Sequence, residues 1–123
     1  MRRKREISAL LTGILAGGLI LVGPVGATKR ATPRKTVKVG DNFFSPRKLR
    51  VKKNTTIVWK WSRANGDSHD VLLTKRPKGV KRFHSAPAAT DYSFRRRLRK
   101  PGTYKILCTF HQEMRQTIVV KRG

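Results

Sequence analysis

Apolar and polar residues alternate along most of the chain after residue 36. Val37 and Val39 lie two residues apart, and Ile57, Trp59 and Trp61 continue this spacing. The alternation recurs in four further runs, namely Leu49–Val51, Tyr92–Leu98, Tyr104–Cys108 and Ile118–Val120. Because successive side chains of a strand point to opposite faces, a period of two predicts half-buried β-strands. No window of twelve residues in this part of the chain has a helical stripe, so we expect an all-β fold.

Turn-forming residues separate the predicted strands. They cluster at Gly40-Asp41-Asn42, Ser45-Pro46, Lys53-Asn54, Asn65-Gly66-Asp67 and Pro101-Gly102. Short strands with regular turns predict an antiparallel sandwich or barrel. Residues 75–89 are polar and basic and contain Pro, so we expect a long loop there, with at most a short strand around Phe83.

Most Lys and Arg residues occupy the outward positions of the alternation. Arg95 and Arg97, for example, fall on the polar face of their strand. Charged outer faces protect the edges of a sheet from pairing with other chains. Arg96 is an exception, because it falls on the apolar face with Phe94 and Leu98.

The first 27 residues are organised like an export signal. Arg2-Arg3-Lys4-Arg5 form a positive segment, and an apolar stretch of 16 residues, Ile7–Val22, follows. Pro24 and the small residues Val25-Gly26-Ala27 then predict cleavage after Ala27. An uncleaved N-terminal anchor is the alternative, although the stretch is shorter than the ~20 residues of a usual spanning helix.

The chain is therefore expected to have three parts. Residues 1–27 are the signal peptide, residues 28–35 a basic tether without periodicity, and residues 36–123 the folded domain. Export would place the mature protein in the periplasm, at the cell surface or in the medium.

Length and charge narrow the functional classes. A chain of 123 residues is too short for a multidomain enzyme, and its single cysteine excludes a disulfide framework or a multi-cysteine zinc cluster. The chain has 30 basic and 6 acidic residues. Without residues 1–27 there are 26 basic and 5 acidic residues in 96, a formal charge of +21. A surface of this charge attracts anionic partners.

Four side chains carry candidate metal chemistry. Cys108, His111 and Met114 follow one another at intervals of three in the segment between two predicted strands, and His69 lies upstream at the start of another. One thiolate, two imidazoles and a thioether form the ligand set of a blue copper electron-transfer site. Zinc also binds Cys and His, but a Met ligand favours copper.

Each of these residues also has an ordinary structural interpretation. A single Cys is often a buried apolar residue, a single His is usually satisfied by hydrogen bonds, and a Met near a strand is usually core. The joint pattern in an exported chain favours the metal, because an unpaired exported thiol needs an explanation.

The segment Pro101–His111 resembles the ligand strand and loop of plastocyanin/azurin-type cupredoxins. The spacing Cys-x2-His-x2-Met is closest to that of amicyanin and small bacterial plastocyanin-like proteins. The similarity extends over about residues 36–121. Five further segments are similar to other parts of this family, namely Asp41–Pro46, Leu49–Val51, Thr55–Trp59, Ser68–Val71 and Phe83–Ser85.

The resemblance implies a Greek-key antiparallel β-sandwich of about seven to eight strands with one type 1 copper near one end. It implies His69, Cys108 and His111 as equatorial ligands and Met114 as the axial ligand. His111 would reach the surface and pass the electron. Asp70, where the family commonly has Asn, would accept a hydrogen bond from Thr109, and such bonds orient metal ligands.

Two features of the candidate site depart from the family pattern. Gln112-Glu113 replaces the frequent Pro-Gly between the histidine and the methionine. Carboxylates at Asp70 and Glu113 favour Cu(II), so we expect a lower potential than with neutral side chains there. His84 is expected to be a solvated loop residue. Aromatic residues, namely Phe44, Phe110 and Trp59, are expected to pack in the core or line the site.

The predicted function is that of a monomeric, non-enzymatic one-electron carrier outside the cytoplasm. Its partner would be a redox protein with an acidic docking surface, and an anionic envelope surface would also attract it. Copper binding or delivery is the alternative with the same ligands. A cationic polyanion binder is a third interpretation, but no motif for specific nucleic-acid recognition is present.

Overall fold

A computed structural model describes residues 31–123 of the chain. The predicted signal segment 1–27 and the first residues of the tether lie outside this range. The strands are β1 (Arg34–Gly40), β2 (Phe43–Ser45), β3 (Lys48–Lys52), β4 (Thr55–Trp61), β5 (Leu72–Lys75), β6 (Ser93–Leu98), β7 (Gly102–Cys108) and β8 (His111–Lys121). Residues 31–123 include no helix with the length and apolar character needed to cross a membrane.

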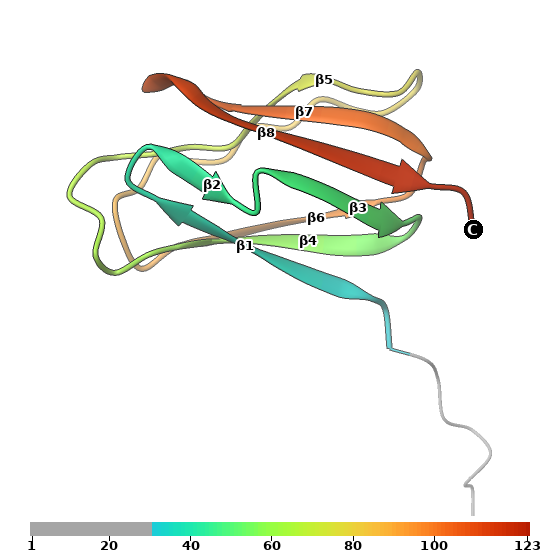
Figure 1. Cartoon of the computed structure of the whole chain (residues 1–123), viewed down its shortest axis with the longest axis horizontal. Helices are drawn as coiled ribbons and strands as arrows, with labels where there is room; N and C mark the ends of the chain where they lie inside the picture. Colours follow the sequence, from blue (N-terminus) through green and yellow to red (C-terminus); the bar gives the residue numbers. More distant parts are fainter. Residues whose placement is uncertain (1–30) are drawn as a thin grey trace, which may run out of the picture. The chain divides into compact units, whose positions relative to one another are not determined.

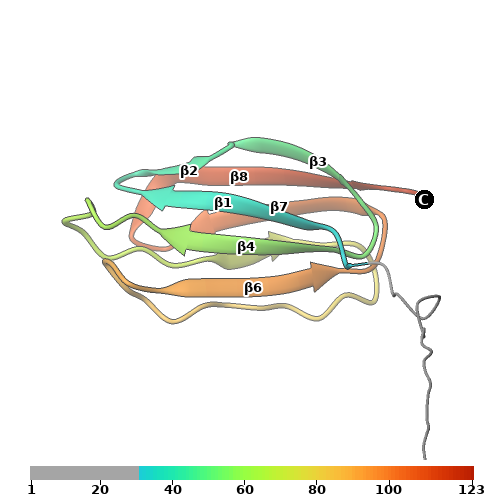
Figure 2. The same ribbon diagram turned by 90° about the horizontal axis from the view of Figure 1, so that it is seen from below.

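The eight strands form two sheets that pack face to face (Figures 1 and 2). Their strand orders are β2-β1-β4-β6 and β3-β8-β7-β5. The predicted all-β sandwich with seven to eight strands is confirmed. The expectation of purely antiparallel pairing is wrong for two pairs, because β1 runs parallel to β4 and β3 runs parallel to β8. An alternation of apolar and polar residues indicates which face of the sheet a side chain occupies. It is the same in parallel and antiparallel sheets, so it does not indicate the direction of the neighbouring strand.

Strand β1 begins at Arg34, two residues before the expected start of the folded domain. Arg34 pairs with Thr56 and Lys35 pairs with Ile57. The Thr56 N–H also donates to the carbonyl oxygen of Pro33 at 2.8 Å. The side chains of Arg34 and Lys35 are exposed, so backbone pairing alone holds them in the sheet and no apolar residue marks the strand start.

The core lies between the sheets and contains the inward residues of the alternation. The fully buried apolar side chains include Val37, Val39, Ile57, Trp59, Val71, Leu73, Cys108 and Ile118. Burial of each large side chain stabilises the fold by roughly 1.5–3 kcal/mol. One buried polar residue joins the two layers: Trp59 Nε1 donates to Gln116 Oε1 at 2.9 Å, and Gln116 Nε2 donates to the Pro46 carbonyl at 2.8 Å.

The segment between β5 and β6 is the long loop that the sequence predicts. Two isolated bridges fasten it, one between His69 and Ala88 and one between Leu72 and His84. Phe83 packs inward, with its ring centroid 5.9 Å from those of both Trp59 and Phe94. The loop therefore covers the open side of the core next to β6.

Candidate metal centre

The predicted ligands meet at the end of the sandwich where β7 turns into β8. Cys108 is the last residue of β7, and His111 is the first residue of β8. The segment after β4 brings His69 to the same end. The loop between these two strands is shorter than the sequence predicts, because it contains only Thr109 and Phe110. The pairing between β7 and β8 continues as far as Cys108 and His111, with a shift in register between Leu107 and Cys108. The spacing of the residues in the sequence does not reveal that the pairing extends this far.

Three donor atoms converge on one point. The Cys108 Sγ lies 3.9 Å from the Nδ1 atom of His69 and 3.7 Å from the Nδ1 atom of His111. All three donors lie within 4.8 Å of one another. With metal–sulfur and metal–nitrogen distances of about 2.3 and 2.0–2.1 Å, a trigonal arrangement separates S from N by about 3.8 Å. The residues therefore fit a single trigonal metal ion.

The ligand cluster is shielded from water except at one member. His69 and Cys108 are fully buried, whereas 26 % of the His111 side chain is exposed. Met114 is buried in the core on β8. It directly precedes Arg115, which pairs with Leu107 next to Cys108, so β8 brings Met114 close to the end of β7.

Burial also affects the thiol itself. Desolvation raises the pKa of Cys108 above its ordinary value of 9.0, although backbone N–H groups nearby partly oppose this shift. A metal ion must therefore displace the thiol proton, because only the thiolate binds well.

Asp41 is a residue of the candidate site that the sequence did not reveal. Its Oδ1 lies 2.8 Å from His69 Nε2, and its carboxylate also accepts the N–H groups of Gly66 and Asp67. The Gly66 N–H is the largest influence that lowers the pKa of Asp41, followed by His69. The carboxylate accepts the Nε2 proton and so leaves the Nδ1 lone pair of His69 facing Cys108. In the sequence Asp41 is only a turn residue 28 positions from His69.

Asp70 connects the two ligand segments. The Thr109 N–H donates to Asp70 Oδ1 at 2.7 Å, and the Thr109 hydroxyl donates to Oδ2 at 2.6 Å. Burial, the largest single influence, acts to raise the pKa of Asp70, but the hydrogen bonds from Thr109 and His84 together lower it. The structure thus places Asp70 and Thr109 in the contact that the sequence predicted.

His84 differs from its predicted role. Its side chain is 49 % exposed, as expected of a loop residue, but Nε2 donates to Asp70 Oδ2 at 2.8 Å. An isolated bridge to Leu72 on β5 holds the loop there. Because this contact joins two separate segments of the chain, the residues around His84 give no sign of it. Among the aromatic residues, Trp59 and Phe44 are buried in the core, whereas Phe110 is 52 % exposed beside the ligand turn.

Carboxylates concentrate around the cluster. Asp41 contacts one ligand, Asp70 contacts the ligand turn, and Asp67 Oδ2 lies 3.9 Å from His111 Nε2. Negative charge at this distance favours the higher oxidation state of a bound redox metal.

The chain is similar to a known small copper protein over nearly its whole length. It is 24% identical over 120 residues to amicyanin-alpha from Methylorubrum extorquens, covering 97% of this chain and 99% of that protein.

Solved structures show the same fold. A reduced Cu(I) form of an amicyanin variant matches with a TM-score of 0.61 and 21% identity, over 78% of this chain and 88% of the other. The copper-containing nitrite reductase from Thermus scotoductus matches with a TM-score of 0.68 and 23% identity, over 82% of this chain. The chain spans only 25% of the length of that reductase. The family model of the cupredoxin-like domain matches residues 13–120, and the chain therefore belongs to the cupredoxin-like family.

Proposed function

We propose that this chain is a type 1 copper protein that carries single electrons. The observation that supports this most strongly is the convergence of His69 Nδ1, Cys108 Sγ and His111 Nδ1 on one trigonal point. These three residues would hold the ion, and we propose Met114 as a fourth ligand. Copper would supply a Cu(II)/Cu(I) couple.

The residues of the chain set the conditions for electron transfer. A thiolate and a thioether are soft ligands that stabilise Cu(I), and the imidazoles suit both oxidation states. Cys108 and His111 lie on two paired strands, and Asp41 and Asp70 fix the orientation of His69 and of the turn. Little movement is then needed when the charge changes. The exposed His111 is the exit toward a partner.

The proposal does not include enzyme activity. The matched segment makes up only 25% of the nitrite reductase that shares the fold, so most of that enzyme has no counterpart in this chain. Within residues 31–123, the cluster of His69, Cys108 and His111 is the one group of such donors close enough to hold an ion. An electron carrier needs no more than this.

The test is the visible spectrum of the full chain after addition of Cu(II). We expect an intense blue absorption that Cys108→Ser abolishes. His84→Gln is the matched control, because it removes a half-exposed imidazole outside the donor cluster, and it should keep the colour. A colourless protein that binds zinc equally well would reject the proposal.

Reversible redox cycling separates electron transfer from copper delivery. An electron carrier should pass repeatedly between Cu(II) and Cu(I) at an electrode and keep its metal in the presence of a weak chelator. Rapid loss of copper to the chelator would instead support delivery.

We further propose that the chain is exported, with residues 1–27 as a cleaved signal and residues 36–123 as the folded domain. The positive segment and the apolar stretch Ile7–Val22 support this assignment. Residues 28–35 would be the tether, whose last two residues already pair in β1. N-terminal sequencing of the protein from fractionated cells should begin at Thr28. A membrane-bound chain that still begins near Met1 would support the anchor instead.

A further inference from the structure

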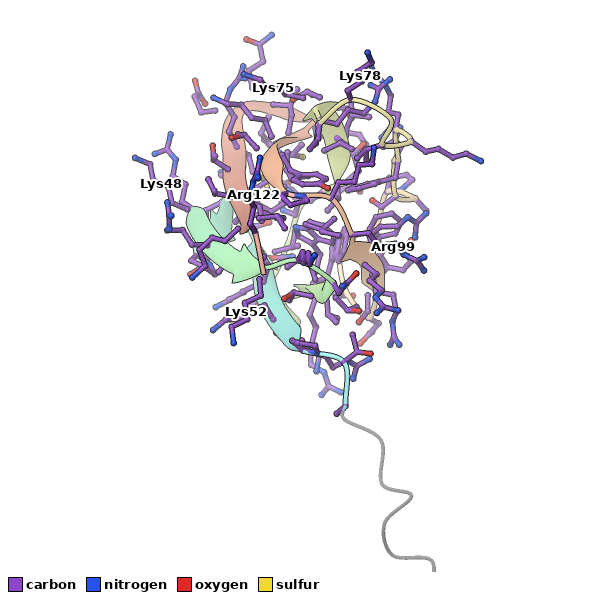
Figure 3. All side chains as sticks on the ribbon, turned by 90° about the vertical axis from the view of Figure 1, so that its right-hand side faces the viewer. Lys48, Lys52, Lys75, Lys78, Arg99 and Arg122 are labelled. Atoms are coloured by element: carbon purple, nitrogen blue, oxygen red, sulfur yellow. The ribbon has the colours of Figure 1, made fainter. Side chains whose placement is uncertain are left out.

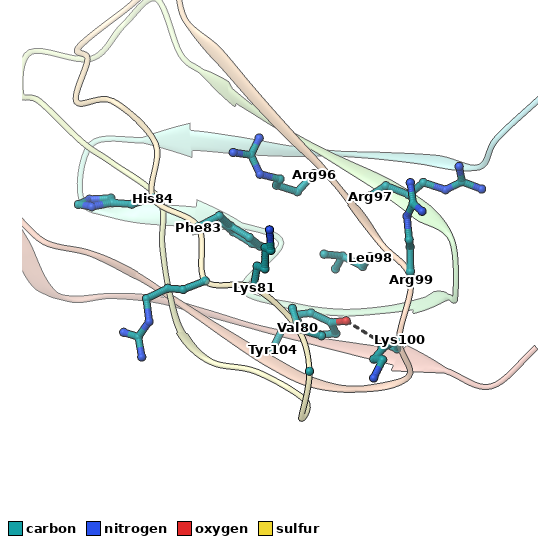
Figure 4. Close-up of a pocket in the computed structure, with 12 residues that line it drawn as sticks. Val80, Lys81, Phe83, His84, Arg96, Arg97, Leu98, Arg99, Lys100 and Tyr104 are labelled. Carbon is teal, nitrogen blue, oxygen red and sulfur yellow. Dashed lines mark hydrogen bonds between the residues drawn. The ribbon is translucent and has the colours of Figure 1, made fainter.

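A groove of about 680 Å³ lies between the C-terminal part of β6 and residues 79–84 of the long loop (Figure 4). Phe83, Leu98 and Tyr104 contribute apolar surface to its lining. Its cationic residues are Lys81, Arg82, Arg96, Arg97, Arg99 and Lys100. The groove therefore combines apolar surface with strongly positive walls.

Arg96, which breaks the alternation in the sequence, is held at this groove. Its guanidinium lies 4.3 Å from the ring centroid of Phe94 and 5.6 Å from that of Phe83. One of its N–H groups donates to the Arg95 carbonyl at 2.8 Å, which leaves other N–H groups free for a ligand. Within residues 31–123, no carboxylate forms an ion pair with a cation of the groove.

The backbone of β6 offers a second kind of contact. β6 is the last strand of its sheet and pairs only with β4. In an antiparallel pair, every second residue directs both of its backbone groups toward the partner strand. The Trp61 N–H donates to the Tyr92 carbonyl, and the register of β4 and β6 continues this pattern in steps of two. The even-numbered residues of β6 therefore direct their backbone groups toward β4. The backbone N–H groups of Arg95 and Arg97 and the C=O group of Arg97 therefore face the free edge, whereas the Arg95 carbonyl already accepts a hydrogen bond from Arg96. Such an edge is a template for an added strand.

The two ends of the groove differ. At one end Lys100 Nζ donates to the Lys78 carbonyl at 3.1 Å. At the other end lies His84, whose Nε2 donates to Asp70, and Asp70 accepts two hydrogen bonds from Thr109. Thr109 directly follows Cys108, so side-chain hydrogen bonds connect the groove to the metal-binding turn.

We propose that this groove binds an extended, carboxylate-rich segment of a partner protein. Carboxylates would meet the arginines, and the peptide backbone would exchange hydrogen bonds with the free edge of β6. A peptide strand both donates and accepts along such an edge, whereas the phosphates of a membrane or a nucleic acid only accept. The identity of this partner as the redox partner rests on the proposed function, but the binding itself does not.

Amide hydrogen exchange of the full chain tests the strand addition. The probe is a ten-residue peptide that alternates Glu and Thr, and the control peptide has Gln in place of Glu. At physiological salt we expect the Glu peptide to slow exchange at the amides of Arg95 and Arg97, and the Gln peptide to have little effect. Binding without protection of these amides would overturn the proposal.

Paired substitutions test the position of the site. Arg96→Gln with Arg99→Gln should weaken binding of the Glu peptide about tenfold, because two exposed charge contacts are lost. Lys48→Gln with Arg115→Gln removes the same charge from residues outside the groove and should weaken binding less than about threefold. Equal losses would show diffuse attraction to net charge and would overturn the proposal. If the groove variant fails to fold, the exchange measurement on the unaltered chain decides.

Competition identifies the class of ligand. Phosphatidylglycerol vesicles and a DNA duplex should compete with the peptide only at low salt. If either protects Arg95 and Arg97 better than the peptide does, a polyanion surface replaces the proposed protein partner. The binding measurements use both metal-free and copper-loaded chain. Peptide binding by a chain that never becomes blue would therefore reject the proposed function alone.

Discussion

At the scale of single residues, the two nitrogen atoms of His69 have different partners. Nδ1 lies 3.9 Å from the Cys108 sulfur, and Nε2 lies 2.8 Å from the Asp41 carboxylate. A carboxylate behind a ligating imidazole fixes its tautomer and its orientation and increases its basicity. Asp41 is therefore a positioning residue for the metal.

Asp41→Ala should lower the affinity for Cu(I) by about tenfold, because the imidazole loses its orienting acceptor. Competition with a Cu(I) chelator measures the affinity, and nitrogen NMR of His69 reports the tautomer. Asp91→Asn is the control, since it removes an exposed carboxylate that lies 4.0 Å from Arg63. Unchanged affinity together with an unchanged tautomer in Asp41→Ala would contradict this role.

Asp70→Asn should raise the reduction potential. The carboxylate accepts the Thr109 N–H next to Cys108, and its negative charge stabilises Cu(II) more than Cu(I). Redox titration measures the change, and Asp91→Asn removes the same formal charge from an exposed carboxylate. A potential that stays constant or falls would be inconsistent with this explanation.

Metal binding should release a proton from Cys108 at neutral pH. Burial raises the pKa of this thiol, so the metal-free protein holds the proton that the metal must displace. The apparent affinity should therefore rise about tenfold per pH unit between pH 7 and 8.5. A titration in weak buffer with a pH indicator counts the protons. An affinity independent of pH would mean that the thiolate already exists without metal.

The sequence reveals the ligand residues far better than the residues that orient them. Cys108, His111 and Met114 are close in the chain, and their residue types are unusual enough to be noticed together. Asp41 and His84 reach the site through contacts between distant segments, and their own neighbourhoods look like ordinary turn or loop. Asp70 is recognisable in the sequence only through the family resemblance.

At the scale of elements, the alternation predicts the strands that pack one face against the core. It finds the central parts of β1, β4, β6 and β7. It does not reveal how far β8 extends, because Gln112 and Glu113 are both exposed and polar. It also does not reveal the parallel pairs, because their direction depends on the path of the chain between the sheets.

Gly102 begins β7 in a backbone conformation that favours glycine. Its φ is 136°, and an added Cβ would lie 2.7 Å from Pro77 Cγ. Gly102→Ala should therefore reduce the free energy of unfolding by about 1–3 kcal/mol. Gly66→Ala is the matched control, because the nearest atom to its added Cβ is 3.9 Å away. Urea unfolding measures both, and equal stabilities would show that Pro77 moves aside freely.

At the scale of the whole molecule, charge is unevenly distributed. Residues 31–123 contain 24 basic residues and 5 carboxylates. Three of these carboxylates contact the ligands or their turn. The opposite end, where β3 and β8 finish, carries basic side chains, among them Lys52, Arg99 and Arg122 (Figure 3). The molecule is therefore strongly cationic, with its negative charge concentrated near the metal.

The rate at which small, charged metal complexes oxidise the reduced protein should depend on this net positive charge. The rate with ferricyanide should fall about tenfold as the ionic strength rises from about 0.01 to 0.2 M, because salt screens the attraction. A cationic cobalt complex should react faster as salt is added. The opposite dependence for both reagents would mean that the carboxylates near His111, and not the net charge, control the encounter.

Strand β8 runs the whole way from the partly exposed candidate ligand His111 to Lys121, close to the end of the chain. The ten steps between the first and the last of its 11 residues, at about 3.3 Å each, span roughly 33 Å. Anything bonded covalently at Gly123 is thus held far from His111, the proposed electron exit. A chain immobilised through its last residue on a gold electrode or a bead would present His111 to the solution, whereas attachment through a side chain near Phe110 would cover it.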